Sequence, residues 1–533
     1  MRLLIFLGIL MILACGRQAQ AKTGRNLLSD EQVRQARENV QKLDWARKSL
    51  EDTKAAVEWV LAMPDEDLWE FIPPADQPRA LNVRFGFDCP IHGKEIFKKG
   101  GHYPWIRDRE HPYKVTCPVG GETYPSNDFD AWYKGGKKEK LDTHQPYVDD
   151  GYGWIDKDGN HYWFVAHYIF WQRWRTDILP VIPKLAYVYV LTGDTRYSHK
   201  AAVMLARIAG EYPKMDYKKQ AYHNGVWPSS TPGKLLDLDW EGSGTVVPLA
   251  TAYDEIYDGI DSDPALSTFL AGKGIKSPKD FFETNFLQEA VRAIESGIIH
   301  GNMNYQNQLA TVATVLDNRD PAKGFTTEQM VDWIMHGPGE MNTLLYNTIT
   351  RDGSASEESI GYMSIWITAF YSLAEKLKPL GYDLFANPRL KKMADFYIQA
   401  AVAEKYNPNI GDSEGDMVGS APPVWGAGMY RTAYEIWGDP AYAKVLNRIG
   451  WPVPAIYEKP DALDKEEAKA KALGTDLGLK TRDLGGYGLA ILETGKADDR
   501  RAAIMHYGSS GAWHGHMDRL NIEMWSHGRC VLP

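Results

Sequence analysis

The 533-residue sequence predicts a mainly α-helical protein, in which antiparallel helical hairpins form a barrel that is followed by the beginning of an antiparallel β domain. Apolar residues recur with the period of a helix from Trp174 to about Ile449. After residue 480 the pattern changes to strand-length segments separated by turn residues. The length also exceeds one ordinary hydrophobic core, so we expect at least two domains.

The first 21 residues are predicted to be an export signal. Arg2 precedes an apolar run over residues 3–14, which is too short to span a bilayer as a permanent helix. Ala19-Gln20-Ala21 is typical of signal cleavage and predicts a periplasmic or secreted protein. Ile12-Leu13-Ala14-Cys15 resembles a bacterial lipoprotein box and predicts a lipid anchor in the outer membrane. Both processing patterns stay open.

The helical domain is expected over residues 22–475. Ser29 and Gln32 have the spacing of a capping box, ahead of a long amphipathic stretch that continues through Met63. Residues 66–160 are different, because they are rich in Gly, Pro, aromatic and charged residues and contain few periodic runs. We therefore expect an insert of long irregular connections there.

One short pattern occurs twice in the helical region. Residues 189–197 and 434–442 both contain Tyr, three residues, Gly-Asp, two residues and Tyr. Glycine is suited to the left-handed position that ends one helix, and aspartate caps the next helix. Each copy is therefore predicted to be the turn of a helical hairpin.

The C-terminal segment, residues 480–533, is predicted to begin a β domain. Strands are expected at residues 485–493, 501–507 and 520–532. Three strands alone would leave an apolar face and open edges uncovered. We therefore expect the sequence to end inside this domain, which would make it truncated.

Charge and aromatic content limit the class of partner. The formal net charge is −10, from 60 Lys and Arg against 70 Asp and Glu, which argues against a nucleic-acid partner. An anionic glycan would need local Arg, Lys or His side chains to offset this charge. The sequence also contains 18 Trp and 29 Tyr, whose flat faces fill cores and also pack against sugar rings.

Two cysteine motifs lie in the predicted insert. Cys89-Pro90-Ile91-His92 and Cys117-Pro118-Val119-Gly120 look like the two halves of a zinc knuckle that lacks one ligand. A disulfide or a pair of free thiols is the simpler interpretation in an exported protein.

Three separated motifs contain the residue types that catalysis needs. Residues 301–308 read Gly-Asn-Met-Asn-Tyr-Gln-Asn-Gln, at the start of a predicted helix. Residues 352–362 read Asp-Gly-Ser-Ala-Ser-Glu-Glu-Ser-Ile-Gly-Tyr, and residues 514–518 read His-Gly-His-Met-Asp ahead of a predicted strand. Together they resemble the heparinase II/III-like superfamily of polysaccharide lyases, which includes exolytic alginate lyases. Over nearly the whole chain, the resemblance implies an (α/α) toroid, incomplete here, followed by the start of an antiparallel β-sandwich.

The resemblance also implies roles for individual residues. Tyr362 corresponds to the general acid, which often acts as the base too, and His514 assists it or is the base. Asn304 is expected to neutralise the substrate carboxylate, with Asn302 as the alternative, because Tyr305 follows where the family often has His or Trp.

The resemblance further implies that His516 binds a structural zinc ion. Relatives draw the other ligands from strands after the His-x-His element, so we expect an incomplete zinc site in this chain. His514, His516 and Asp518 alternate, so an extended strand would turn all three to one face. That spacing suits a metal site, and it equally suits the polar face of a solvated strand.

Elimination across C4 and C5 of a uronate explains these residue types. The C5 proton is weakly acidic, so the adjacent carboxylate must be neutralised by hydrogen bonds, as from an amide. A base must then remove the proton while an acid protonates the leaving oxygen, and a Tyr can do either. Without the resemblance, Tyr362 would be interpreted as a core or capping residue and the Asn residues as helix caps.

The carboxylates allow a different interpretation. Glu357-Glu358 and the acidic run at residues 412–416 are compatible with a glycoside hydrolase on a similar toroid. We favour Glu357 as a group that contacts substrate and orients its neighbours, and residues 412–416 as a solvated loop near the cleft. Trp240, beside Glu241, is predicted either to line the path of the sugar or to pack in the core.

The sequence therefore predicts a polysaccharide lyase that acts on a uronate-containing acidic polysaccharide or oligosaccharide by β-elimination. A toroid glycoside hydrolase and a non-catalytic glycan-binding relative are the alternatives. Elimination leaves a 4,5-unsaturated sugar that absorbs ultraviolet light, whereas hydrolysis does not. Alginate, a glycosaminoglycan and ulvan all remain open as substrates, as do endo and exo action.

Overall fold

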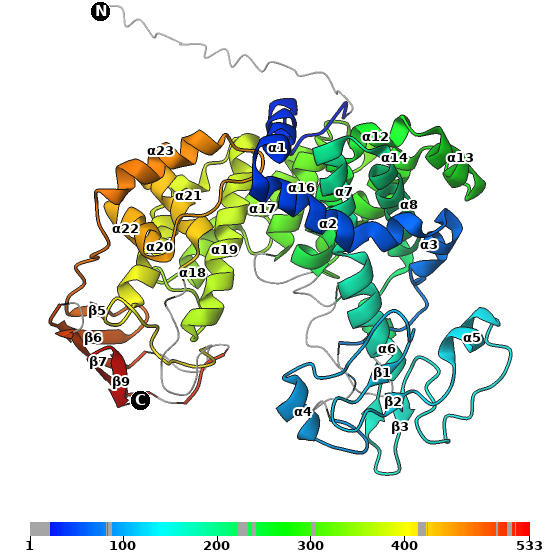
Figure 1. Cartoon of the computed structure of the whole chain (residues 1–533), viewed down its shortest axis with the longest axis horizontal. Helices are drawn as coiled ribbons and strands as arrows, with labels where there is room; N and C mark the ends of the chain where they lie inside the picture. The colour runs from blue at the N-terminus through cyan, green and yellow to red at the C-terminus, as the bar shows by residue number, and fades with distance from the viewer. Residues whose placement is uncertain are drawn as a thin grey trace, which may run out of the picture.

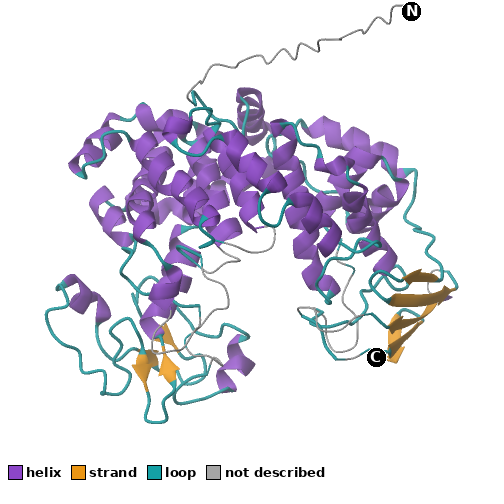
Figure 2. Cartoon of the chain, turned by 180° about the vertical axis from the view of Figure 1, so that it is seen from behind, coloured by secondary structure: helices purple, strands orange, loops and turns teal. Residues whose placement is uncertain are grey.

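The computed structural model describes residues 22–81, 83, 88–221, 233–236, 241–299, 304–413, 423, 425–496, 499–508, 514–517 and 519–532. These residues are mainly helical and end in an antiparallel sheet, which confirms the predicted fold class. The helices form an arch, with an irregular insert below one end and the sheet below the other (Figures 1 and 2). Within the described chain, none of the helices has the length and apolar character needed to cross a bilayer.

The N-terminal region contains helices α1 (Asp30–Lys42), α2 (Asp44–Ala62) and α3 (Asp65–Phe71). The predicted capping box is present, because Ser29 and Gln32 each accept a hydrogen bond from the other's backbone N–H. The single long stretch expected through Met63 is wrong, since Leu43 has extended backbone angles (φ −114°, ψ 126°) and divides it into two helices.

The insert between α3 and α6 is irregular, as predicted. Its elements are short: α4 (Glu95–Gly100), β1 (Val115–Thr116), β2 (Thr123–Tyr124), α5 (Phe129–Lys134), β3 (Trp154–Ile155) and β4 (His161–Tyr162). The strands make two separate antiparallel pairs, β1 with β2 and β3 with β4. Packed aromatic rings supply much of its core, including Trp105, Tyr124 and Phe164.

The remaining helices form the body of the arch. They are α6 (Phe164–Tyr168), which continues as the π-helix Ile169–Ile178, α7 (Val181–Thr192), α8 (Thr195–Glu211), α9 (Tyr217–Ala221), α11 (Val247–Glu255), α12 (Tyr257–Asp261), α13 (Pro264–Gly272), α14 (Pro278–Phe282), α15 (Gln288–Glu295), α16 (Asn304–Leu316), α17 (Thr327–His336), α18 (Met341–Thr348), α19 (Ile360–Leu377), α20 (Pro388–Ala400), α21 (Ala427–Trp437), α22 (Pro440–Ile449) and α23 (Pro460–Lys471).

Both copies of the repeated pattern are turns between packed helices. Gly193 ends α7 in the left-handed conformation (φ +73°), and Asp194 caps α8 by accepting the Arg196 N–H. Gly438 (φ +62°) and Asp439 do the same between α21 and α22. The prediction of helical hairpins at these positions is confirmed, because the helices of each pair pack together.

The C-terminal sheet has five antiparallel strands in the order β5 (Arg482–Leu484), β6 (Leu489–Thr494), β7 (Arg501–His506), β8 (Asn521–Ser526) and β9 (Arg529–Leu532). The strands expected near 485–493 and 501–507 are present as β6 and β7. The single strand expected at 520–532 is wrong, because His527 and Gly528 have positive φ (+50° and +74°) and turn the chain between β8 and β9. The sequence pattern also missed β5, which is only three residues long.

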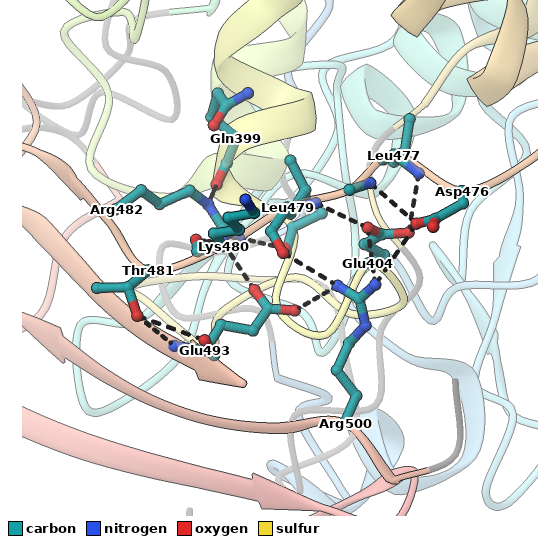
Figure 3. A network of polar contacts seen from close by, with 12 residues as sticks. Gln399, Glu404, Asp476, Leu477, Leu479, Lys480, Thr481, Arg482, Glu493 and Arg500 are labelled. Carbon is teal, nitrogen blue, oxygen red and sulfur yellow. Dashed lines mark hydrogen bonds and ion pairs between the residues drawn. The ribbon is translucent and has the colours of Figure 1, made fainter. Parts of the chain in front are cut away.

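A buried network of ion pairs attaches the sheet to the helices (Figure 3). Glu493 on β6 binds Arg482 (2.6 Å) and Arg500 (2.9 Å). The second guanidinium nitrogen of Arg500 binds Glu404, 2.9 Å away in the loop after α20, and Glu404 also pairs with Arg448 of α22. Both carboxylates are 2% exposed or less, so the network holds one edge of the sheet against the ends of α20 and α22.

Candidate active site

The first turn of α19 positions Tyr362. The Ser359 side chain caps the helix by accepting the Tyr362 N–H at 3.5 Å. Ile360 and Met363 are buried in the core, which leaves Tyr362 half-buried on the other side of the turn. The Ser359 cap and the alternation of buried and partly exposed residues therefore place the Tyr362 side chain at the N-terminal end of α19.

Tyr362 stacks directly on His514, which comes from the loop between β7 and β8. The ring centroids are 3.5 Å apart and the ring planes are parallel to within 5°. The phenol at the start of α19 and the imidazole of the loop between β7 and β8 are therefore in face-to-face contact.

Glu357 holds the imidazole of His514. The Glu357 Oε2 atom lies 2.8 Å from His514 Nδ1, and the two side chains are 14% and 30% exposed. With Nδ1–H donating to the carboxylate, Nε2 is the nitrogen that can face a substrate. Glu357 thus fixes both the orientation and the tautomer of the ring.

Two glycines allow the loop of His514 to lie flat on the helical domain. His514 has positive φ (+59°), and its carbonyl accepts the Asp412 N–H at 2.8 Å. A Cβ atom at Gly411 would lie 2.2 Å from that carbonyl oxygen, and one at Gly515 would lie 1.8 Å from Glu358 Oε2. Larger residues at either position would push the loop, and with it the imidazole, away from α19.

His516 does not share a strand face with His514, so that expectation is wrong. Both residues lie in the loop, because strand β8 begins only at Asn521. His516 Nε2 pairs with Asp412 Oδ1 at 2.8 Å, and both side chains are about half exposed. Among the described residues no third His, Cys, Asp or Glu joins this pair at ligand distance, and Asp518 lies outside them. Zinc at His516 stays a prediction.

The Asp-Gly element ahead of Tyr362 joins the two domains. Asp352 Oδ2 accepts the backbone N–H of Tyr487 at 3.1 Å and also that of Gly486, in the turn between β5 and β6. Gly353 has φ +98°, and a Cβ atom there would lie 2.0 Å from the Lys392 carbonyl oxygen on α20. This element therefore positions the site and does not supply an acid or a base.

The other predicted residues are only partly described. Asn304 is the first residue of α16, as expected, but its side chain lies outside the described part, as do Asn302 and Trp240 entirely. Helix α16 packs on α19, and Asn307, one turn further along, donates to the Ala369 carbonyl at 3.0 Å. The helix that begins at Asn304 is therefore fixed to the helix that carries Tyr362.

Glu241 belongs to the core and not to a sugar path. Its side chain is completely buried, and it accepts the Tyr212 hydroxyl at 2.6 Å and the N–H groups of Leu235 and Leu236. Burial raises the pKa of Glu241 above its ordinary value, and these donors oppose that shift. Packing is thus the correct interpretation for this residue.

Asp412 is a site residue whose role sequence reasoning missed. We expected a solvated loop at residues 412–416, and the Asp412 side chain is about half exposed, while residues 414–416 lie outside the described residues. The Asp412 N–H also donates to the His514 carbonyl, its carbonyl accepts the Ser359 hydroxyl at 3.1 Å, and its carboxylate binds His516. These contacts link positions separated by 53 residues or more, so no local pattern could have indicated them. The Gly411-Asp412 pair was the one usable signal, because it indicates a tight turn.

No protein-family model and no curated protein matches this sequence. Among solved structures, the heparan sulfate lyase HepC from Pedobacter heparinus aligns with 14% identity and a TM-score of 0.42, covering 75% of this chain and 59% of that one. A heparinase III gene product aligns with 15% identity and a TM-score of 0.42, covering 76% and 58%. A further heparinase III structure aligns with 14% identity and a TM-score of 0.39, covering 66% of this chain and 48% of that one. The chain thus spans less than two thirds of the length of these polysaccharide lyases.

Proposed function

We propose that this protein is a polysaccharide lyase that cleaves a uronate-containing acidic polysaccharide or oligosaccharide by β-elimination. The observation that carries the proposal is the stack of Tyr362 on His514, with Glu357 bound to the far nitrogen of the imidazole. A phenol and an oriented imidazole side by side form an acid–base pair that acts on neighbouring atoms of one sugar.

The proposed reaction needs two proton movements on one sugar. A base takes the C5 proton, the C–H electron pair becomes the C4–C5 double bond, and the C4–O4 bond breaks with its electrons on O4. O4 then takes a proton from the acid. Tyr362 gives this proton, and either Tyr362 or His514 takes the first one. The amide of Asn304, with Asn302 as its alternative, hydrogen-bonds the uronate carboxylate and stabilises the enolate-like charge.

The carboxylates described around Tyr362 favour elimination over hydrolysis. A glycoside hydrolase needs two carboxyl groups facing each other across the glycosidic bond. Here Glu357 binds His514, Asp412 binds His516, and Glu358 is 2% exposed. Two of these three carboxylates thus pair with histidines and the third is buried, whereas the Tyr362–His514 stack supplies the groups that elimination needs.

The location and partners of the protein follow from the same proposal. Residues 1–21 would export the chain to the periplasm or beyond, as a soluble protein or as one anchored through a lipid on Cys15. An acidic glycan is the partner there, with Trp240 contributing an aromatic face to its binding. A zinc ion at His516 would have a structural role only.

A panel of uronate polysaccharides tests this function. Alginate, glycosaminoglycans and ulvan are incubated with the protein, and ultraviolet absorption is followed. We expect absorbing products from at least one, and we expect Tyr362→Phe to lower kcat by about 10²–10⁴-fold, because it removes the hydroxyl alone. Tyr382→Phe, on an exposed surface, is the matched control. New reducing ends without absorption would indicate a hydrolase, and binding without turnover would indicate a glycan-binding protein.

A further inference from the structure

The two cysteine motifs of the insert come together at one point. Cys89 and Cys117 are buried and free, and His92 lies between them. The potential ligand atoms of these three residues all lie within 4.8 Å of one another. Two separate turns build this cluster, one from Cys89 to Gly93 and one between β1 and β2, so residues 28 positions apart in sequence converge on it.

The interatomic distances match a tetrahedral metal site. His92 Nδ1 lies 3.5 Å from Cys117 Sγ and 3.8 Å from Cys89 Sγ. Zinc bonds of about 2.3 Å to sulfur and about 2.0 Å to nitrogen, at the tetrahedral angle, place S and N about 3.6 Å apart. The three side chains thus already stand where one metal ion could contact them all.

Glu122 contacts His92 and is the candidate for the ligand that the sequence motif lacks, although it lies outside the group of three residues whose ligand atoms are all within 4.8 Å. Its Oε2 atom lies 3.4 Å from His92 Nδ1, and the same tetrahedral geometry places N and a carboxylate O about 3.3 Å apart. Oε2 is buried and has no hydrogen-bond partner within the described structure. A buried carboxylate oxygen without a donor is costly unless a cation offsets it.

Gly120 shows why a carboxylate takes the fourth position. A Cβ atom at Gly120 would lie 2.3 Å from both His92 Cε1 and Glu122 Oε1, so the side chain of residue 120 would point into the cluster. The backbone of Gly120 is not in the left-handed region, whereas that of Gly121 is (φ +81°). The turn therefore needs glycine only at Gly121, and the space left open at Gly120 is filled by Glu122.

The surroundings of the sulfur atoms suit metal-bound thiolates. The Tyr124 hydroxyl lies 3.7 Å from the sulfur of Cys89 and can donate a hydrogen bond to it. Donors of this kind stabilise a negatively charged sulfur and orient it toward a metal. His92 and Glu122 are 25% and 34% exposed, so solvent reaches the cluster from their side.

We propose that Cys89, His92, Cys117 and Glu122 bind one zinc ion with a structural role. Two thiolates favour zinc over magnesium or calcium, and binding releases the two thiol protons. In the part of the insert that the structure describes between α3 and α6, no helix is longer than six residues and the strands have two residues each. Such a segment gains much of its stability from a metal crosslink, as small domains with little core commonly do. This site is separate from the prediction at His516.

Metal analysis of the purified full chain is the first test. We expect about one zinc ion per chain, falling to about one tenth of that in Cys89→Ser and Cys117→Ser. Cys530→Ser is the matched control and should retain zinc. A zinc content that is undiminished in the Cys89→Ser, Cys117→Ser double variant would overturn the proposal.

Thiol reactivity in the unmodified chain provides a test that needs no variant to fold. Cys89 and Cys117 should react with iodoacetamide at least about tenfold faster after a chelator removes the metal, while Cys530 should not change. A Cys89–Cys117 disulfide, seen as resistance to alkylation until a reductant is added, would refute zinc binding. Equal reactivity with and without the chelator would do the same.

The fourth ligand has its own test. Glu122→Gln should weaken zinc binding by about tenfold or more, because a carboxylate is a better zinc ligand than an amide. If Glu122→Gln leaves the affinity unchanged, a water molecule is the fourth ligand and the assignment of Glu122 is wrong.

Discussion

Replacing Glu493 by Gln should weaken the attachment of the C-terminal sheet to the helices. The side chain keeps its shape but loses its charge, at a position that is 1% exposed. Its two partners respond differently. Arg500 retains Glu404, whereas Arg482 is left with backbone carbonyl oxygens such as that of Ala401 at 2.7 Å. A guanidinium that is 10% exposed thereby becomes an uncompensated buried charge.

The structure also sets the size of the effect. Removing one partner of a buried ion pair, so that the other charge stays buried, costs about 3–5 kcal/mol. Arg500→Met should cost less, about 1.5–3 kcal/mol, because Glu493 keeps Arg482 and Glu404 keeps Arg448. The network contains three arginines around two buried carboxylates, with Asp476 exposed at its edge, so losing a buried carboxylate unbalances it more than losing an arginine.

Hydrogen exchange read by mass spectrometry measures this directly. Peptides that contain β6 and β7 report the free energy for opening of the sheet, separately from the helices. Glu51→Gln, on the exposed surface of α2, is the matched control and should change nothing. An opening free energy of β6 within about 0.5 kcal/mol of the wild type would refute the reasoning, as would a larger effect of Arg500→Met than of Glu493→Gln.

Three further predictions concern the site and the helices. Glu357→Gln should lower kcat by about 10–100-fold with the fold intact, because an amide holds His514 less firmly than a carboxylate does. Steady-state kinetics on the substrate found among the uronate polysaccharides would show this loss, and an unchanged kcat would contradict it. Lys376→Met should stabilise the protein at pH 7 by about 2 kcal/mol, because burial lowers the pKa of Lys376 to about 8 from 10.5. Between pH 8 and pH 10.5 the unfolded chain binds more protons at Lys376 than the folded protein does, so the free energy of unfolding of the wild type should rise over this range relative to that of the variant. Urea-unfolding midpoints of the two proteins that change in parallel with pH would contradict this. Gly353→Ala should cost about 2–3 kcal/mol in thermal or urea unfolding, since its Cβ would meet the Lys392 carbonyl; wild-type stability would show that the turn can shift.

Local patterns account for most of the fold that could be predicted. The turns at Gly193 and Gly438 were visible because a left-handed glycine and a capping aspartate act within a few residues. The break at Leu43 and the turn at His527 were missed because neither residue is typical of such a position. Three-residue β5 has too few residues to show a period at all.

Long-range contacts account for what the sequence could not show at the site. The motifs identified Tyr362, His514 and Asn304 as residue types suited to elimination, and Glu357 as a group that orients its neighbours. That the two rings stack, that Glu357 holds the imidazole and that Asp412 binds His516 are decided by contacts across 104 to 157 residues. No spacing rule predicts such contacts, because they depend on how the sheet docks on the helices.

The cysteine cluster likewise combines local features that the sequence shows with contacts that only the tertiary structure shows. The sequence alone determined two half-motifs with three ligands, since Cys89 and His92 share one turn and Cys117 begins another. Only the tertiary structure brought the turns together and placed Glu122 in the space beside Gly120. The physical reason is that residue type and turn chemistry are local, whereas the distance between ligands on different turns depends on the packing of the whole insert.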